Sequence, residues 1–434
     1  MLKRFRGIFY GWWMVAASFF VMLVCGGTAV YGFTAFFDPI YQEMGWSRAE
    51  TALAFSMRSV EGGIVQPIIG FFVDRVGARK CVIAGILIMA LSLILISRLS
   101  NLLTFYSGFF VLALGNTLAS GIPEYTAIAN WFRKRRALAL GILTAGMGIS
   151  GIMTPVLTKL IDSFGWRETL LIMFPVVLVI GIPLALVIRH RPEPYGLKPD
   201  GEKMADDPPV NVAEMKTAPV KAPAVTQVEE GLSIKQCLRS RIFWLLLLYS
   251  CFTQFANSAL QVHEMSHLVN VGISRDMAAL TMTGYTGFSL VGRLGLSWLG
   301  DKHSKKNILI ICAAMQAVGI FIFSYISSPW MIIAFILFYA PGFGGPIPLL
   351  PAIQADYFGT KAFATMRGLM AIGYTIPGII GPWFAGWIAD TTGSYHLAFL
   401  IYSALSACAI PIMMMTTLKR GQAPAAKVEI ASAH

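Results

Sequence analysis

Charged residues are scarce in this chain of 434 residues, where Asp, Glu, Lys and Arg together make up only 13% of the sequence. A soluble domain carries about 25% charged residues, so the scarcity excludes an ordinary water-soluble protein. Hydrophobic residues make up 56% of the chain, and the mean hydropathy is +0.66. These values predict an integral membrane protein.

Several enzyme and metal-site signatures are also missing. The chain contains no P-loop for ATP, no GxSxG and no CxxC pair. Its six cysteines fall mostly in apolar stretches, where packing explains them better than a disulfide framework. We therefore expect no enzyme, no cofactor and no metal. The lack of a nucleotide site favours gradient-driven transport over an ATP-driven pump.

Long apolar stretches are abundant. Because about 20 apolar residues cross a bilayer, they predict twelve transmembrane helices in an all-α membrane protein. The expected helices lie near residues 11–37, 48–74, 79–98, 102–130, 136–160, 167–188, 241–268, 275–300, 306–326, 329–354, 363–388 and 396–418. The first apolar run is long and leads straight into the bundle, so we expect no cleavable signal peptide.

The net charge of +12 is distributed unevenly. Of the 34 Lys and Arg residues, 27 fall on the side of both termini, two lie within the membrane, and five lie opposite: Arg48, Arg98, Lys159, Arg167 and Arg275. This asymmetry follows the positive-inside rule. Both termini and the segment 189–240 are therefore expected in the cytoplasm, and the excess of bases does not indicate a nucleic-acid partner.

The chain divides into two halves that echo each other. RRALALGILTAGMGISGIMTP at 135–155 matches MRGLMAIGYTIPGIIGPWFAG at 366–386, each a basic start followed by a Gly-rich helix that can pack closely. The segment between the halves is rich in Pro, Ala, Lys and Glu and cannot bury a core, although GLSIKQCLRS near its end predicts a short surface helix. We expect a first six-helix bundle at 1–190, a cytoplasmic linker at 191–238, a second bundle at 239–420 and a cytoplasmic tail at 421–434.

The most specific motif is GFFVDRVGARK at 70–80, with a weaker copy, SWLGDKHSKK, at 297–306. In both, an apolar helix runs into a small residue, an acid and several bases. The glycine allows close approach, the acid can cap a neighbouring helix, and the bases hold the loop in the cytoplasm. The pattern resembles the loop signature of the major facilitator superfamily. This resemblance implies two pseudo-symmetric six-helix bundles around a central cavity, with transport by alternating access.

Within that superfamily the chain resembles the monocarboxylate transporters and the oxalate/formate antiporter group. FYGWWMVAASFF at 9–20 resembles the Gly-Trp entry to helix 1, and NWFRKRRALALGILTAGMGISG at 130–151 resembles the signature that opens helix 5. RPEPYGLKPDG at 191–201 is typical of prokaryotic members. The resemblance covers nearly the whole chain except 203–230. It implies a monomeric, multi-pass transporter in a prokaryotic inner (plasma) membrane, with a small organic anion, a proton and the lipid bilayer as its partners.

Arg293 is the principal candidate for substrate binding. It lies eight residues before Asp301, about 12 Å from the cytoplasmic end of helix 8. A buried arginine costs about 2.5–3.5 kcal/mol and needs a partner or a purpose. The resemblance implies that it binds the substrate carboxylate, which a planar guanidinium fits. The alternative is a structural ion pair within the second half.

The proton carrier is less clear from the sequence. The animal monocarboxylate transporters have an aspartate one turn before the arginine and a lysine in helix 1, whereas this chain has Ser289 and, roughly, Val30 or Tyr31. Helix 7 instead carries a polar stripe along one face: Ser250, Gln254, Asn257, Gln261 and Glu264. His263, assisted by Glu264 or by the substrate itself, is the expected proton acceptor. A packed or exposed histidine is the alternative.

Other polar residues within the helices carry further expectations. Arg58 and Glu61 predict a mutual pair one turn apart, with gating for Arg58 and proton coupling for Glu61 as alternatives. Glu124 is expected to pair with the bases that follow helix 4. Cavity roles are expected for Asn116, Asn257, Gln261 and His263, and for tyrosines that packing would explain equally well: Tyr31, Tyr125, Tyr339 and Tyr374.

Gating is expected of Arg58 within helix 2 and of charged residues at the cytoplasmic end, namely Asp74, Arg75, Arg79, Arg135, Arg136 and Asp301. Asp74 should lie beside the N-terminus of helix 11, near residues 363–367, where a helix favours an anion. Three functions remain open: a proton-coupled monocarboxylate symporter, a carboxylate antiporter, or a sensor with a transporter fold. Antiport would favour a second cation in the cavity, for which Arg58 is the sequence-based candidate.

Overall fold

The computed structural model describes residues 9–46, 62, 64–201 and 231–416. Over these residues the chain is almost entirely helical, and the only β pairing described is an isolated bridge between Gly231 and Gly359. Ten helical segments in the described ranges are long and apolar enough to cross a membrane. The expected all-α membrane fold is confirmed. Arg48, Arg58 and Glu61 lie outside the described residues.

Nine helices make up the described part of the first half. They are α1 (Tyr10–Ala29), α2 (Thr34–Met44), a helix at residues 64–76, α4 (Ala78–Ser97), α5 (Leu102–Ala119), α6 (Ile122–Trp131), α7 (Arg136–Ile149), α8 (Met153–Phe164) and α9 (Trp166–Val187). The second half comprises α11 (Arg241–Asn270), α12 (Arg275–Val291), α13 (Ser297–Lys302), α14 (Lys305–Ser324), α15 (Pro329–Gly344), α16 (Pro346–Phe358), α17 (Phe363–Met370), α18 (Ile372–Thr392) and α19 (His396–Met414).

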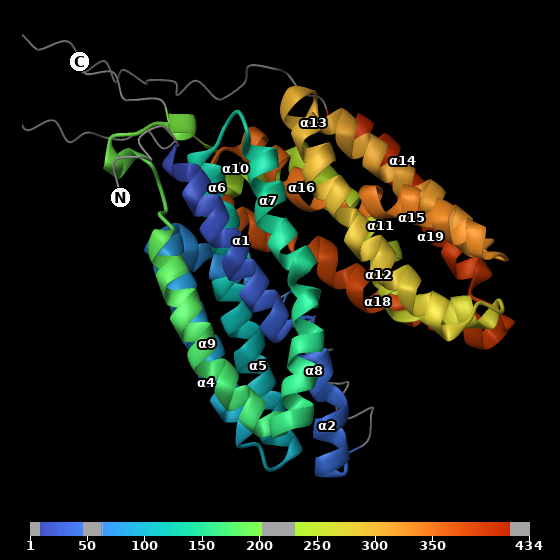
Figure 1. Ribbon diagram of the computed structural model, residues 1–434. Helices are drawn as coiled ribbons and strands as arrows, with labels where there is room; N and C mark the ends of the chain where they lie inside the picture. Colours follow the sequence, from blue (N-terminus) through green and yellow to red (C-terminus); the bar gives the residue numbers. More distant parts are fainter. Residues whose placement is uncertain (1–8, 47–61, 63, 202–230, 417–434) are drawn as a thin grey trace, which may run out of the picture.

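The two halves meet at one end and separate toward the other. In Figure 1 the blue and green helices of the first half lie beside the yellow and red helices of the second, close together near α6, α7, α13 and α16. Backbones touch there: a Cβ atom at Gly70 would lie 2.2 Å from the Ala364 oxygen, and one at Gly141 would lie 2.3 Å from the Arg293 oxygen. Only glycine permits this approach, so the sequence itself allows this end to close.

Several expected single helices are broken into two. Helix 1, expected at 11–37, ends at Ala29 and resumes at Thr34. Helix 4 breaks between α5 and α6 at Gly121, whose φ of 155° belongs to glycine. Helix 8 contains a π-helical turn, Gly292–Leu296, between α12 and α13. Irregular backbone within a membrane is tolerated where it is buried in protein or lines a cavity. We therefore expect these breaks to lie in the interior of the protein.

The linker is attached to both halves by its described ends. The Asp200 carboxylate accepts hydrogen bonds from the Arg133 and Lys134 amides at 3.2 and 2.8 Å, which gives the RPEPYGLKPDG motif a structural role. At the other end, the Leu232 amide donates to the Phe358 carbonyl at 2.8 Å. The short helix expected after this point is present as α10 (Ile234–Arg239).

Candidate functional site

Arg293 lies in the π-helical turn of helix 8 and is only 4% exposed. Its Nη1 donates to the Thr144 carbonyl of α7 at 2.6 Å, so its guanidinium reaches across from the second half to the first. Its Nε is buried and has no hydrogen-bond partner among the described residues. π-Helical turns occur frequently at functional sites, and this one holds a cation with one donor unused.

Aromatic residues of the first half surround Arg293. Tyr31, in the break of helix 1, and Tyr125, on α6, lie close enough to interact with it electrostatically. A Cβ at Gly148 would lie 3.2 Å from its Nη1, so a small residue on α7 leaves room for the guanidinium. No ion pair within the described residues includes Arg293. This arrangement gives no support to the alternative of a structural pair within the second half.

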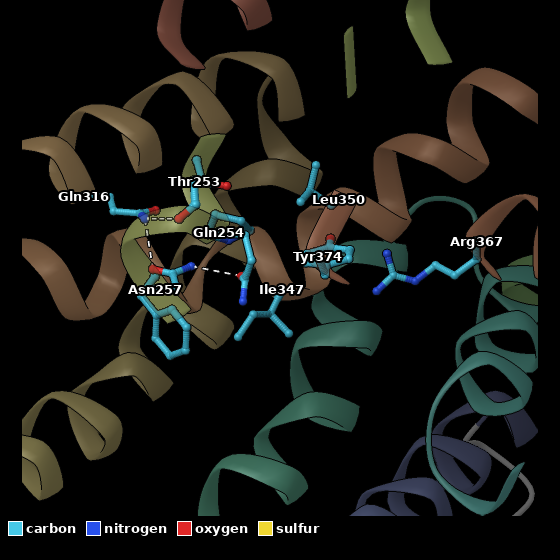
Figure 2. A pocket seen from close by; sticks show the side chains of 10 residues that line it. Thr253, Gln254, Asn257, Gln316, Ile347, Leu350, Arg367 and Tyr374 are labelled. Carbon is cyan, nitrogen blue, oxygen red and sulfur yellow. Dashed lines mark hydrogen bonds between the residues drawn. The ribbon is translucent and has the colours of Figure 1, made fainter. Parts of the chain in front are cut away.

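A cavity of about 100 Å³ lies in the second half, and Arg293 is not among the residues that line it. Its lining residues come from α11, α14, α15, α16, α17 and α18: Thr253, Gln254, Asn257, Gln316, Phe343, Pro346, Ile347, Leu350, Arg367 and Tyr374. Figure 2 shows the amide side chains gathered on one side and Arg367 extending toward Tyr374 from the other. Of the predicted cavity residues, Asn257 and Tyr374 line it.

Asn257 is held at the centre of a hydrogen-bond network. Its Oδ1 accepts from Gln316 Nε2 at 2.9 Å and from the Tyr339 hydroxyl at 3.0 Å, while its Nδ2 donates to Gln254 Oε1 at 3.4 Å. Tyr339 is 1% exposed and does not line the cavity. Tyr339 therefore orients Asn257, and Gln254 presents the amide that is freer to meet a ligand.

Arg367 is a charged cavity residue outside the predicted set, and the polar lining residues Thr253 and Gln316 also lie outside that set. Arg367 was expected only as a basic residue at the start of helix 11. Its Nη1 is buried without a hydrogen-bond partner among the described residues, and its guanidinium carbon lies 4.9 Å from the centre of the Tyr125 ring. The repeat between the halves matches Arg367 with Arg136, which by contrast is paired with Asp356 and bonded to the Phe132 carbonyl. The repeat alone does not show which of the two arginines has an acidic partner, because that depends on contacts between distant residues.

The three remaining candidates on α11 lie in different environments. His263 directs Nε2 at the Pro382 carbonyl at 2.8 Å, with its ring 5.0 Å from that of Tyr395, and does not line the cavity. Gln261 is exposed on the surface of the protein. Glu264 is 2% exposed, and neither of its carboxylate oxygens has a hydrogen-bond partner among the described residues. The geometry of His263 favours the packed histidine, while the proton role of Glu264 stays a prediction.

Residues 263–267 read His-Glu-x-x-His, a spacing found in zinc proteases. The two imidazoles face different carbonyls, His263 that of Pro382 and His267 that of Phe323. No group of three potential metal ligands occurs among the described residues. The spacing therefore carries no metal site there.

In the first half, Asn116 lies against the break between α5 and α6. It is 8% exposed, and its Oδ1 accepts from the Ser120 hydroxyl at 3.1 Å. Glu124 was expected to pair with the basic cluster after helix 4, but no such pair occurs among the described residues. It is fully buried, and neither carboxylate oxygen has a hydrogen-bond partner among the described residues.

At the closed end, two aspartates connect the halves through hydrogen bonds. Asp74 accepts hydrogen bonds from the Ala364 amide at 3.2 Å and from the Thr365 amide and hydroxyl at 2.9 and 2.6 Å, all on α17, as expected for this residue. Asp301 accepts from the Ala137 and Leu138 amides of α7 at 2.9 and 2.8 Å.

The basic residues at this end have different positions. Arg136 forms an ion pair with Asp356 across the halves, and Lys305 reaches the same carboxylate at 2.8 Å. Arg75 is exposed and packs on Phe71 of its own helix, with the guanidinium carbon 4.1 Å from the ring centre. It therefore does not link the halves in this conformation. Arg79 is half-buried and Arg135 is exposed.

Comparison with known proteins identifies relatives over the full fold. Rat monocarboxylate transporter 12 is 27% identical over 405 residues, covering 90% of this chain and 82% of the relative. Human monocarboxylate transporter 14 is 25% identical over 464 residues, covering 91% and 88%. These relatives are vertebrate proteins, so they do not support the expectation of a prokaryotic member.

Solved structures show the same fold. The fucose:proton symporter FucP of E. coli superposes with a TM-score of 0.67 at 16% identity, covering 93% of this chain and 98% of that one. The proton:xylose symporter XylE gives a TM-score of 0.73 at 14% identity, covering 93% and 95%. The family model described as Major Facilitator Superfamily matches residues 17–269 and 258–432. This chain therefore belongs to the major facilitator superfamily of secondary transporters.

Proposed function

We propose that this protein transports small organic anions and couples their passage to protons, as a monocarboxylate symporter. The observation that carries the proposal is the nearly complete burial of Arg293 between the halves, with its Nε unused and without an acidic partner among the described residues. A buried charge without a counter-ion is costly. A substrate carboxylate supplies that counter-ion, and the similarity to monocarboxylate transporters supports the same substrate class.

The free edge of the guanidinium suits this ligand. Because the Thr144 carbonyl takes Nη1, the remaining edge consists of Nε–H and one Nη2–H, which can donate to both oxygens of one carboxylate. Tyr31 and Tyr125 add two hydroxyl groups from the first half. A ligand bound here would touch both halves, as alternating access about a central site requires.

We place both termini and the linker in the cytoplasm of a cell whose plasma membrane holds the protein, because the bases concentrate on that side. The end closed by Asp74 and Asp301 is then cytoplasmic, and the described conformation faces outward. Opening that end would break the hydrogen bonds made by both aspartates. These contacts therefore favour the outward-facing state, and a gating role for Asp74, Asp301 and Arg136 follows.

A second function, carboxylate antiport, is favoured by one observation. Arg367 lines the cavity and is a second guanidinium beside Tyr125, with a buried Nη1 that has no hydrogen-bond partner among the described residues. Two cations near Tyr125 would suit a ligand with two negative charges better than a monocarboxylate. Under this alternative a dicarboxylate enters as another carboxylate leaves, without a net requirement for protons.

Uptake into proteoliposomes separates these functions. Purified protein would be supplied with labelled acetate, pyruvate, lactate, oxalate or succinate, with and without an inside-alkaline pH gradient, and with or without unlabelled carboxylate inside. Gradient-driven accumulation of a monocarboxylate supports symport. Uptake of a dicarboxylate that depends on internal carboxylate and ignores the gradient supports antiport. Absence of uptake and binding for every acid would overturn both proposals.

A further inference from the structure

A second buried carboxyl group, outside the predicted site, lies in the first half. Glu124 occupies the first turn of α6, directly after the break at Ser120 and Gly121. Its side chain is fully buried; the Ser18 hydroxyl of α1 lies close to the carboxylate but outside good hydrogen-bond geometry, and no other partner is present among the described residues. Most buried polar groups in proteins are hydrogen-bonded, so this exception requires an explanation.

Among the residues that the structure describes, the groups around Glu124 do not include a counter-ion. Ser18 and Cys25, which share one face of α1, lie beside it, and Tyr125 adjoins it on α6. Helices α4, α5, α7, α16 and α17 also pack on α6, but within the described residues none of them supplies an ion pair to Glu124. The nearest charged group on α17, Arg367, lies instead against the Tyr125 ring.

An ionised carboxylate in this position would be unstable. Removing a carboxylate from water costs several kilocalories per mole unless a cation or several donors compensate. A neutral carboxylic acid avoids most of that penalty. The surroundings of Glu124 therefore favour the protonated form in this conformation, and release of the proton requires that water or a cation reach the group.

Tyr125 connects this acid to the proposed substrate site. It follows Glu124 on the same short helix, carries the Arg367 guanidinium against its ring at 4.9 Å, and also interacts electrostatically with Arg293. A movement of α6 would therefore shift the acid and the wall of the anion site together. Glu124 and Tyr125 are thus consecutive residues of one ten-residue helix.

We propose that Glu124 is the proton carrier of this transporter, protonated while the closed end is sealed and deprotonated when α6 moves on opening. The proposal rests on the proposed function and deepens it. One proton binds to one Glu124 carboxylate oxygen on the outer side, travels with one monocarboxylate bound at Arg293, and leaves to water on the inner side. The substrate remains an anion throughout, and the carboxylate of Glu124 is regenerated.

The proposal is tested with three substitutions of acids by glutamine. Glu124→Gln mimics the protonated side chain, Glu264→Gln removes the other buried acid, and Glu168→Gln, an exposed acid in the first turn of α9, is the matched control. Each protein would be assayed for gradient-driven accumulation, for proton entry reported by a trapped pH dye, and for equal exchange of label at symmetrical pH. The probe is whichever of acetate, pyruvate or lactate the wild type accumulates.

Glu124→Gln should lower gradient-driven accumulation by about tenfold or more, the size of a typical coupling between two sites, and should abolish proton entry. Exchange should stay within about threefold of the wild type, because exchange needs no change of protonation. The Glu168→Gln control should behave as the wild type. Retained accumulation in Glu124→Gln, or its loss only in Glu264→Gln, would overturn the proposal. If a folded Glu124→Gln protein lost both exchange and accumulation, the proposal would also be overturned.

A substrate-independent measurement separates this inference from the proposed function. Infrared spectra at neutral pH should show the carbonyl stretch of a protonated carboxyl group that disappears in Glu124→Gln and persists in Glu168→Gln. If that band is absent, the proton assignment fails even when uptake of carboxylates succeeds. If the band is present but no carboxylate is transported, the proposed function fails and the protonated Glu124 stands.

Discussion

Asp74 and Asp301 hold equivalent places in the two halves, and each accepts backbone hydrogen bonds from the first turn of a helix in the opposite half. The two contacts are thus reciprocal, since the first half binds α17 and the second half binds α7. Unpaired amides and the positive end of a helix dipole both favour an anion at such a position. The two aspartates therefore close one end of the transporter symmetrically.

The charge of Asp74 should control the conformational equilibrium. Asp74→Asn removes the charge but keeps one acceptor, and should shift the balance toward the inward-open state by about 1–2 kcal/mol, or roughly 5- to 30-fold. The matched control is Asp162→Asn, an exposed acid on α8. Distances between spin labels at the exposed residues Ser163 and Thr391, at the open end, should shorten in Asp74→Asn. An unchanged distance distribution would exclude a latch.

Arg293 should tolerate no substitution. Arg293→Lys keeps the charge but loses the paired donors, so affinity should fall substantially. Arg293→Ala should cost about 2–5 kcal/mol of binding, which is measurable as loss of binding in a thermal-shift or calorimetric titration. Arg275→Ala, on the same helix but exposed, is the control. Wild-type affinity for a small carboxylate in a folded Arg293→Ala protein would contradict the assignment.

Arg367 should distinguish ligands by their charge. If it binds a second carboxylate, Arg367→Gln should weaken dicarboxylate binding by about 2 kcal/mol or more and leave monocarboxylate binding within a few-fold. The comparison is a competition assay with oxalate or succinate against lactate on one preparation. Equal effects on both classes would show that Arg367 supports the cavity through Tyr125 and does not select the ligand.

His190 should make stability depend on pH. Its Nδ1 accepts from the Ala78 amide at 3.2 Å, and burial lowers the pKa of His190 to about 4. Because the neutral ring is favoured in the folded protein, its contribution is complete above about pH 6.5 and is lost as the pH falls toward 4. The loss should be roughly 1–2 kcal/mol, because one pKa unit corresponds to about 1.4 kcal/mol and partial exposure of the ring reduces the effect.

Thermal unfolding of detergent-solubilised protein between pH 7.5 and 4, compared with His190→Gln, measures this contribution. The wild type should lose more stability than the variant on acidification. Parallel curves for the two proteins would show that the Ala78 contact does not depend on the protonation of His190.

The sequence predicts the framework of this protein well because its signals are one-dimensional. Hydrophobic length determines where a chain crosses the membrane, and the spacing in 70–80 places Asp74 near the end of its helix, where the N-terminal amides of a neighbouring helix can donate to it. The depth of Arg293 also follows from simple counting along helix 8. These predictions require only position along an axis, which periodicity provides.

The features that the sequence does not predict depend on the direction in which a side chain faces around its helix axis. Arg367 and Arg136 match in the repeat, yet of the two only Arg136 has an acidic partner within the described residues. Glu124 was expected beside the basic cluster, but the break at Gly121 starts a new helix and the side chain is buried against α1 instead. Breaks of this kind arise where packing between helices compensates the lost backbone hydrogen bonds, so local sequence does not determine them.

The attachment of the linker at both described ends has a consequence for assembly. Between the anchor at Asp200 and the anchor at Leu232, residues 201–231 could extend up to about 100 Å, since each residue spans at most about 3.3–3.6 Å. This upper limit from covalent geometry far exceeds what rocking of the halves about a central site requires. The covalent connection therefore fixes the one-to-one ratio of the two halves and keeps them close together, while noncovalent contacts determine how the halves are arranged. Two separately expressed polypeptides, divided within 202–230, should then recognise each other in the membrane and reconstitute one functional transporter.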